Sequence, residues 1–157
     1  MRRMVVLAMC AIVLLLAGCS SEPDLSGKWM SVQKSEWDGS QVVQRLEVSI
    51  VDKDKGSYLF KRFLATDAKG LDVKEFDSKK QFAVVKDKDG NYSFFNGLAN
   101  VPVIYLKESK KMIVAGKEYE KETSELITKI RPVLEEQDAA KAAKKKKTDE
   151  AFRSLVR

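Results

Sequence analysis

The sequence has no histidine, and its two cysteines, Cys10 and Cys19, lie within or directly after an apolar segment at the N-terminus. Without histidine, the chain lacks the commonest general base and the commonest metal ligand. No serine lies in a Gly-x-Ser-x-Gly setting, the usual nucleophile motif of hydrolases. The glycines fall one per turn rather than in a phosphate-binding loop. These absences predict a protein that is not an enzyme and that binds neither a metal nor a cofactor.

Long hydrophobic runs are also scarce, because the longest, residues 4–17, has 14 residues. A membrane-spanning helix needs about 20. Two arginines precede the run, and small residues end it, an order typical of a secretory signal peptide. Leu16-Ala17-Gly18-Cys19 resembles the lipobox of bacterial lipoproteins. This resemblance implies a signal peptide over residues 1–18, cleavage before Cys19 and a diacylglyceryl group on its thiol; an ordinary secretory signal or an uncleaved anchor is the alternative.

The same resemblance implies where the mature chain, residues 19–157, is located. More than one acyl chain anchors a protein stably, so the lipid would hold the domain on a membrane. Ser20 stands where an aspartate would favour the inner membrane, so the expected site is the periplasmic face of the outer membrane. Residues 19–24 are polar with one proline and predict a short tether. Since Cys10 leaves with the signal peptide and Cys19 carries lipid, we expect no disulfide.

Positive charge is concentrated near the C-terminus. The net charge is +6, and removing the two arginines of the signal peptide leaves +4. Much of this excess lies in one run, Lys144, Lys145, Lys146 and Lys147. The run predicts contact with anionic head groups or other envelope acids, at about 1 kcal/mol per charge near a surface. A solvated helix face is the alternative. No aromatic residues alternate with these lysines, so nucleic acid is not an expected partner.

Residues 25–119 show short apolar stretches separated by turns. In Gln41–Val51, for example, Leu46, Val48 and Ile50 alternate with polar residues, which is the period-two pattern of a half-buried strand. Asp38-Gly39, just before this stretch, is a strong hairpin signal. The pattern predicts eight strands: Lys28–Gln33, Gln41–Val51, Ser57–Ala65, Leu71–Phe76, Lys80–Lys86, Tyr92–Phe95, Val101–Leu106 and Lys111–Ala115.

Eight short strands without intervening helices predict a mainly β fold with an antiparallel sheet, either a small barrel or a sandwich. Leu25-Ser26-Gly27-Lys28-Trp29 is similar to the Gly-x-Trp opening of lipocalin-like barrels. The run Ile104–Tyr119 is similar to the closing hairpin of small lipocalin-like bacterial lipoproteins. These resemblances imply a meander that closes around an apolar interior with Trp29 at its base. In a sandwich, Trp29 would be one core aromatic among others.

A helix is predicted for the remaining residues, 120–157. Leu126, Ile130 and Leu134 lie on one face of such a helix and predict packing against the sheet. Pro132 removes a backbone donor and crowds the preceding turn, so we expect it to kink or split the helix. Beyond it the sequence is helix-prone but has almost no apolar face, which predicts an exposed basic tail.

Together these features predict a lipid-anchored envelope lipoprotein whose β domain binds a partner protein or an envelope component without catalysis. The alternative is a lipocalin-like carrier of an apolar small molecule. A carrier needs an internal apolar cavity of at least about 300 Å³. An interaction protein needs a packed interior and an exposed apolar or charged patch.

Overall fold

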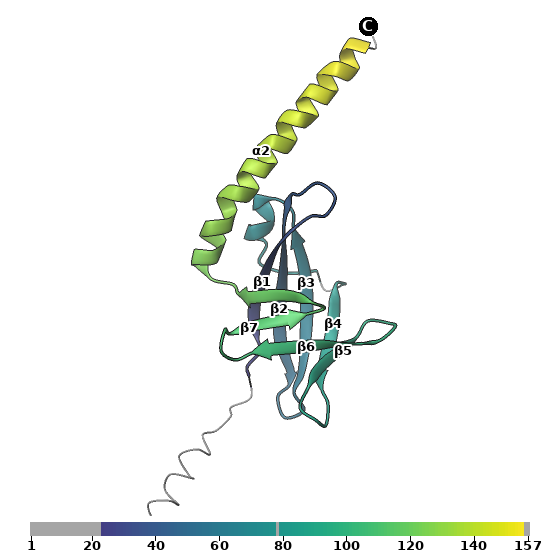
Figure 1. Ribbon diagram of the computed structural model, residues 1–157, viewed down its shortest axis with the longest axis vertical. Coiled ribbons are helices and arrows are strands. Elements are labelled where there is room, and N and C mark those ends of the chain that lie inside the picture. Colours follow the sequence, from purple (N-terminus) through teal and green to yellow (C-terminus); the bar gives the residue numbers. More distant parts are fainter. Residues whose placement is uncertain (1–22, 78, 156–157) are drawn as a thin grey trace, which may run out of the picture.

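The structure is a computed structural model that describes residues 23–77 and 79–155, so the predicted signal peptide and Cys19 lie outside the described residues. Within these ranges the chain forms eight strands, a short 3₁₀ helix and one long α-helix (Figure 1). Their bounds are β1 (Gly27–Lys34), β2 (Gln41–Asp52), β3 (Ser57–Ala65), η1 (Ala68–Asp72), β4 (Gln81–Lys86), β5 (Tyr92–Phe95), β6 (Asn100–Leu106), β7 (Lys111–Val114), β8 (Lys117–Lys121) and α2 (Ser124–Leu155).

The strands form a closed antiparallel barrel in which each strand pairs with the next along the chain. β8 closes the barrel against β1 through two register pairs, Trp29 with Lys121 and Met30 with Glu120. The fold is therefore mainly β, with one helix after the strands, as the alternating pattern predicts. Of the two architectures that the sequence left open, the structure has the barrel.

Aromatic and aliphatic side chains fill the interior of the barrel. Trp29 is fully buried there, and its indole N–H donates a hydrogen bond of 2.8 Å to the carbonyl oxygen of Leu25. Its ring meets Tyr105 edge to face, with 6.2 Å between ring centroids. The interior side chains come from alternate positions of the strands, as the strand pleat requires. They include Leu25, Trp29, Leu46, Val48, Tyr58, Phe60, Val84, Tyr92, Val103, Met112, Val114 and Tyr119.

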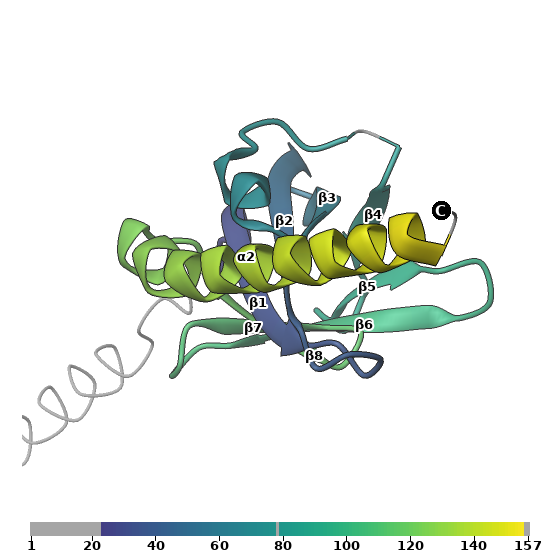
Figure 2. The same cartoon turned by 90° about the horizontal axis from the view of Figure 1, so that it is seen from above.

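A second apolar core lies outside the barrel, where α2 and η1 cover β1, β2 and β3. Figure 2 shows α2 running beside η1. Ile130 and Leu134 of α2 pack against Met30 and Val43 of the strands, and the side chain of Leu134 is fully buried. Two reciprocal hydrogen bonds between Gln137 and the backbone of Gln41 fix the helix at the start of β2.

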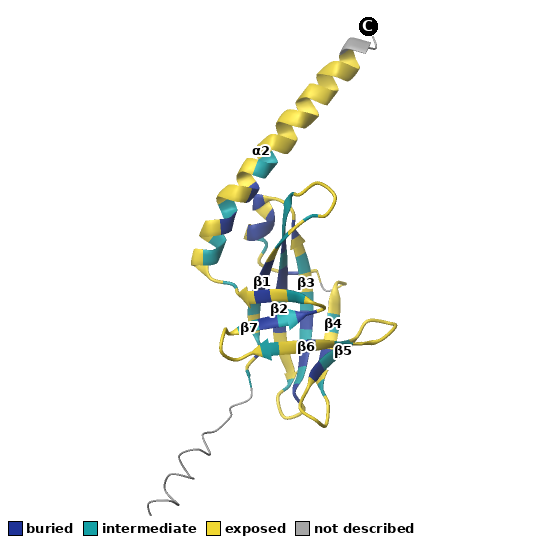
Figure 3. Cartoon of the chain, viewed as in Figure 1, coloured by how far each residue is buried: buried dark blue, intermediate teal, exposed yellow. Residues whose placement is uncertain are grey.

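Beyond Asp138, whose carboxylate accepts a hydrogen bond of 3.0 Å from the N–H of Ala68, α2 leaves the barrel. The ammonium group of Lys141 still reaches the carbonyl oxygen of Thr66 at 3.3 Å, but every residue from 139 to 153 is exposed. Figure 3 shows this change along the helix, from mixed burial near the barrel to exposure on all sides. At 1.5 Å per residue, residues 142–155 extend about 20 Å past the last contact. We call residues 142–155 the projecting part of α2.

Two elements differ between the prediction and the structure: one predicted strand is absent, and one strand was not predicted. Residues 71–76 are not a strand, because the carboxylate of Asp67 accepts from the N–H of Gly70 at 2.8 Å and starts η1, after which the chain is irregular. Leu71 and Phe76 are buried without belonging to a sheet. Instead, the eighth strand is β8, which has only one buried residue, Tyr119, and therefore gives a weak sequence signal.

Pro132 was expected to kink or to split the helix, and the structure shows that it does not split it. α2 is continuous from Ser124 to Leu155 with the proline inside it. An internal proline costs about 3 kcal/mol or more. Buried Ile130 and Leu134 lie on either side of Pro132, and their packing on the strands offsets that cost.

Candidate binding site at the barrel mouth

A cavity of about 400 Å³ opens at one end of the barrel, and we call it the barrel mouth. The turn between β7 and β8 and the connections from β3 to β4 and from β5 to β6 surround it. This is the end opposite to the start of β1. The described residues that line it are Gln44, Leu46, Arg62, Lys79, Lys80, Gln81, Phe82, Phe94, Asn96, Val114, Ala115, Lys117 and Tyr119.

Four of these residues are cations, Arg62, Lys79, Lys80 and Lys117, and they form the cationic rim of the mouth. No carboxylate is among the described lining residues. Within the described part of the chain, none of the four cations forms an ion pair. The mouth therefore concentrates positive charge with no negative side chain in its lining to neutralise it.

The bottom of the mouth is apolar, because it is formed by the side chains of the barrel core that lie nearest to this end. We call Leu46, Phe82, Phe94, Val114 and Tyr119 the apolar floor. The rings of Phe82 and Phe94 are tilted against each other with 4.3 Å between centroids. Each floor residue occupies an inward-facing position of its strand, so the same alternation that builds the core also builds the floor.

One polar pair crosses the floor. The hydroxyl of Tyr119 donates a hydrogen bond of 2.7 Å to the side-chain oxygen of Gln44. The amide nitrogen of Gln44 is then the donor that this pair offers to a ligand. Burial raises the pKa of the Tyr119 phenol to about 12, although nearby Arg62 acts in the opposite direction. At neutral pH, Tyr119 is therefore a hydrogen-bond donor and not a base.

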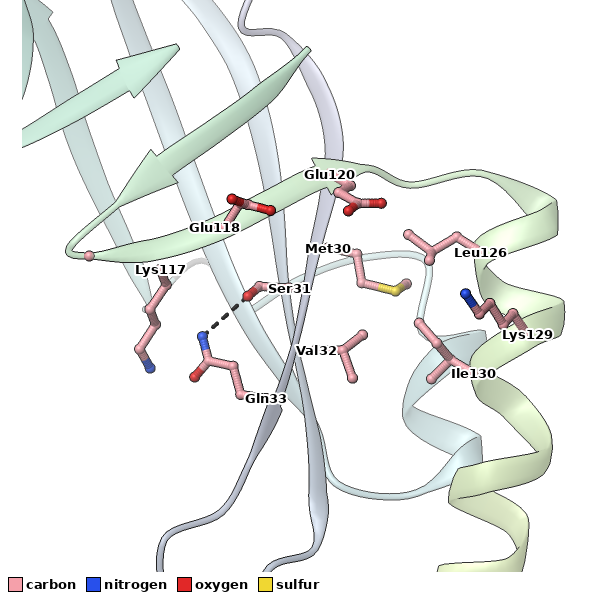
Figure 4. A pocket seen from close by; sticks show the side chains of 11 residues that line it. Met30, Ser31, Val32, Gln33, Lys117, Glu118, Glu120, Leu126, Lys129 and Ile130 are labelled. Carbon is pink, nitrogen blue, oxygen red and sulfur yellow. Dashed lines mark hydrogen bonds between the residues drawn. The ribbon is translucent and has the colours of Figure 1, made fainter. Parts of the chain in front are cut away.

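A second hollow, of about 630 Å³, lies between β1, β8 and the first turns of α2 (Figure 4). Met30, Val32, Leu126 and Ile130 give it apolar walls, and the carboxylates of Glu118 and Glu120 border it. Both carboxylates also contact Lys111, at 2.5 Å and 3.0 Å. The two carboxylates of this hollow are thus paired with Lys111, whereas Lys117, which it shares with the barrel mouth, and Lys129 form no ion pair with another described residue.

The structure separates the site residues predicted from the sequence. Lys144, Lys145, Lys146 and Lys147 lie on the projecting part of α2, exposed and away from the barrel mouth. Of these, Lys146 has a distant contact of 4.0 Å with Glu150, one helical turn later. Cys19, the predicted lipidation site, lies outside the described residues.

The residues of the barrel mouth were not singled out from the sequence. They come from six strands and three connections, and of the four rim cations only Lys79 and Lys80 are neighbours along the chain. A local signal exists only in β8, where Lys117 and Tyr119 alternate with Glu118. Sequence reasoning could have grouped them only with the register of all eight strands in hand.

The fold and the site together define a small closed barrel with a filled interior, a cationic mouth and a helix that projects from its side. Comparisons with protein-family models, with curated proteins and with solved structures give no significant match. Among the described residues, no helix combines the length and apolarity needed to cross a bilayer. The same residues contain no group of three or more cysteine, aspartate or glutamate side chains placed to hold a metal ion.

Proposed function

We propose that this chain is a lipid-anchored protein of the bacterial envelope whose barrel binds an envelope component or a partner protein without catalysis. The observation that carries the proposal is the combination of a filled interior with an open, cationic mouth. A filled interior favours binding at the surface over carriage of an apolar molecule inside the barrel. The apolar carrier is therefore the weaker of the two candidate functions.

The chemistry of the mouth supports binding rather than catalysis. Its polar groups are four cations, side-chain amides and the phenol of Tyr119, whose pKa burial raises to about 12. General acid–base catalysis works best when the pKa of the catalytic group lies near the operating pH. A phenol with a pKa near 12 is far from that condition at neutral pH.

Anchoring at Cys19 would fix how the domain faces the membrane. Pro23 follows Cys19 by four residues, which reach about 14 Å when fully extended. β1 begins shortly after Pro23, at the end of the barrel opposite to the mouth. The mouth and the projecting part of α2 would then point away from the anchoring membrane. The basic run Lys144–Lys147 would thus meet an envelope component on the side of the domain away from the anchoring membrane. It would not contact the lipid head groups of that membrane.

Metabolic labelling with a fatty acid and membrane fractionation test the anchor. The native chain is expected to incorporate label and to sediment with membranes, whereas Cys19→Ser should do neither. Cys10→Ser is the matched control, because this cysteine lies in the predicted signal peptide, and it should behave like the native chain. Ser20→Asp should shift the protein to the inner membrane. Unlabelled native protein, or a Cys19→Ser variant that still carries label, would refute the proposal.

A further inference from the structure

We propose that the barrel mouth binds a small amphiphilic anion, with the charged head on the cationic rim and the apolar body on the aromatic floor. The inference rests on the proposed binding function of the barrel and deepens it, because it names the class of ligand. The arrangement of charge, the shape of the cavity and the polar pair on its floor each carry one step of the argument.

The first step is the charge of the rim. Arg62, Lys79, Lys80 and Lys117 surround one cavity, and no described lining residue is acidic. At the junction between the barrel and α2, in contrast, two cations have carboxylate partners: Arg45 binds Glu122, and Arg131 binds Asp72. Like charges around one cavity repel each other, and an anion that enters relieves this repulsion while gaining charge-assisted hydrogen bonds. The rim thus selects for negative charge.

The second step is the floor and the size of the cavity. Phe82 and Phe94 offer ring surface directly below the rim, and Leu46 and Val114 extend it. A purely polar anion would leave this apolar surface in contact with water, whereas an apolar body would cover it. The volume of about 400 Å³ lies near the lower end of the range for small-molecule sites, about 300–1,000 Å³. Since the filled core blocks deeper entry, the apolar body must be short.

The third step concerns orientation. Tyr119 and Gln44 are joined by a hydrogen bond at the floor, which leaves the amide nitrogen of Gln44 as a donor toward the cavity. The four cations favour a ligand whose anionic oxygen atoms lie at the level of the rim, and the amide of Gln44 offers one donor to a further oxygen atom below them. Carboxylates and phosphates both satisfy this condition, so the shared chemistry is an anionic oxygen head on a short apolar body.

Fluorescence titration of residues 19–157 bearing Cys19→Ser tests the inference, because every contact described here lies within residues 23–155. The first probe is 8-anilinonaphthalene-1-sulfonate, an amphiphilic anion. The second is N-phenyl-1-naphthylamine, which has the same aromatic body without the charge. We expect the double variant Arg62→Gln and Lys117→Gln to weaken binding of the anionic probe about tenfold. Binding of the neutral probe should change less than about twofold, since the floor is intact.

Controls and competitors sharpen this test. The double variant Lys53→Gln and Lys88→Gln removes two exposed lysines from turns at the opposite end of the barrel and should bind both probes normally. Octanoate and octyl phosphate are then used to displace the anionic probe, with octanol as the uncharged competitor. Displacement by octanoate alone indicates a carboxylate ligand, and displacement by octyl phosphate alone indicates a phosphate ligand. Displacement by both supports the wider class of small amphiphilic anions.

Two results would overturn the inference. One is equal binding of the anionic and neutral probes with no effect of the rim variants. The other is displacement by octanol as effective as displacement by the two anions. Both outcomes are independent of fatty-acid labelling at Cys19, so a failure of the mouth site and a failure of the membrane anchor can be told apart.

Discussion

Charged side chains are arranged in opposite ways in two regions of this molecule. They are paired where the barrel meets α2, and at the barrel mouth they form no ion pair with a described residue. At the junction, the guanidinium of Arg45 binds the carboxylate of Glu122 through two hydrogen bonds of 2.8 Å each. It also donates to the carbonyl oxygens of Gly70 and Val73, both at 2.9 Å. At the mouth, four cations surround a cavity and no described lining residue is acidic.

The two arrangements have different roles. The paired charges at the junction stabilise the fold, whereas the rim cations are available to a ligand. The side chains of Arg45 and Glu122 are only 3% and 9% exposed, so each needs the other to compensate for lost hydration. Arg62, Lys79 and Lys80 are exposed to solvent, and no described residue forms an ion pair with them. The first arrangement fixes how the end of β8 meets β2 and η1. The second leaves positive charge free to attract an anion.

The largest expected effect is at the junction. Glu122→Gln leaves the buried guanidinium of Arg45 without a counter-charge, and removing one partner of a buried pair costs about 3–5 kcal/mol. We therefore expect the free energy of unfolding, measured in urea, to fall by about 3 kcal/mol, since glutamine still accepts one hydrogen bond. Asp72→Asn, the same change in the exposed pair with Arg131, should have little effect. Similar losses in both variants would contradict the contrast between the pairs.

The next effect concerns the apolar half of the junction. Leu134→Ala removes a fully buried side chain from the core between α2 and the strands. Such truncations cost about 2–5 kcal/mol. Phe152→Ala removes an exposed ring from the projecting part of α2 and should change stability by less than about 0.5 kcal/mol. Urea unfolding of both variants is the measurement, and a large loss for Phe152→Ala would show that this part of α2 has contacts in solution.

Sequence reasoning predicts the framework of this molecule better than its site. Alternation in β2 and the apolar stripe of α2 are local patterns, and both elements are present at nearly the predicted residues. β8 was missed because Lys117–Lys121 has a single apolar residue, and pairing with β7 and β1 makes it a strand. The barrel mouth depends on which side chains from different strands meet, and that follows from register rather than from any local pattern.

A third effect, of about 2–3 kcal/mol, is expected at high pH from Tyr119 on the floor of the mouth. Burial raises the pKa of this phenol to about 12, from an ordinary value of about 10. The protonated form is thus favoured in the fold, and its contribution to stability is fully present below pH 10. As the pH rises from about 10 to about 12, the unfolded chain loses its proton first, so the contribution is lost.

The contribution of Tyr119 is measured by comparing the native chain with Tyr119→Phe, because exposed lysines titrate over the same range in both. The difference in the free energy of unfolding between the two proteins should shrink by about 2 kcal/mol from pH 9 to pH 12. Absorbance at 295 nm should report one late-titrating tyrosine that the variant lacks. A difference that stays constant with pH would mean that the phenol is accessible to solvent.

The smallest change in the free energy of unfolding is expected for the cationic rim. The sign of this change distinguishes cations that bind a ligand from cations that stabilise the fold. Arg62→Gln with Lys117→Gln removes two cations that have no ion-pair partner in the described part of the chain. Because like charges around one cavity repel each other, stability should be unchanged within about 0.5 kcal/mol or should rise slightly. The increase should diminish in high salt, which screens the remaining repulsion. A loss above about 1 kcal/mol would instead make these cations part of the fold, and the contrast with Arg45 would disappear.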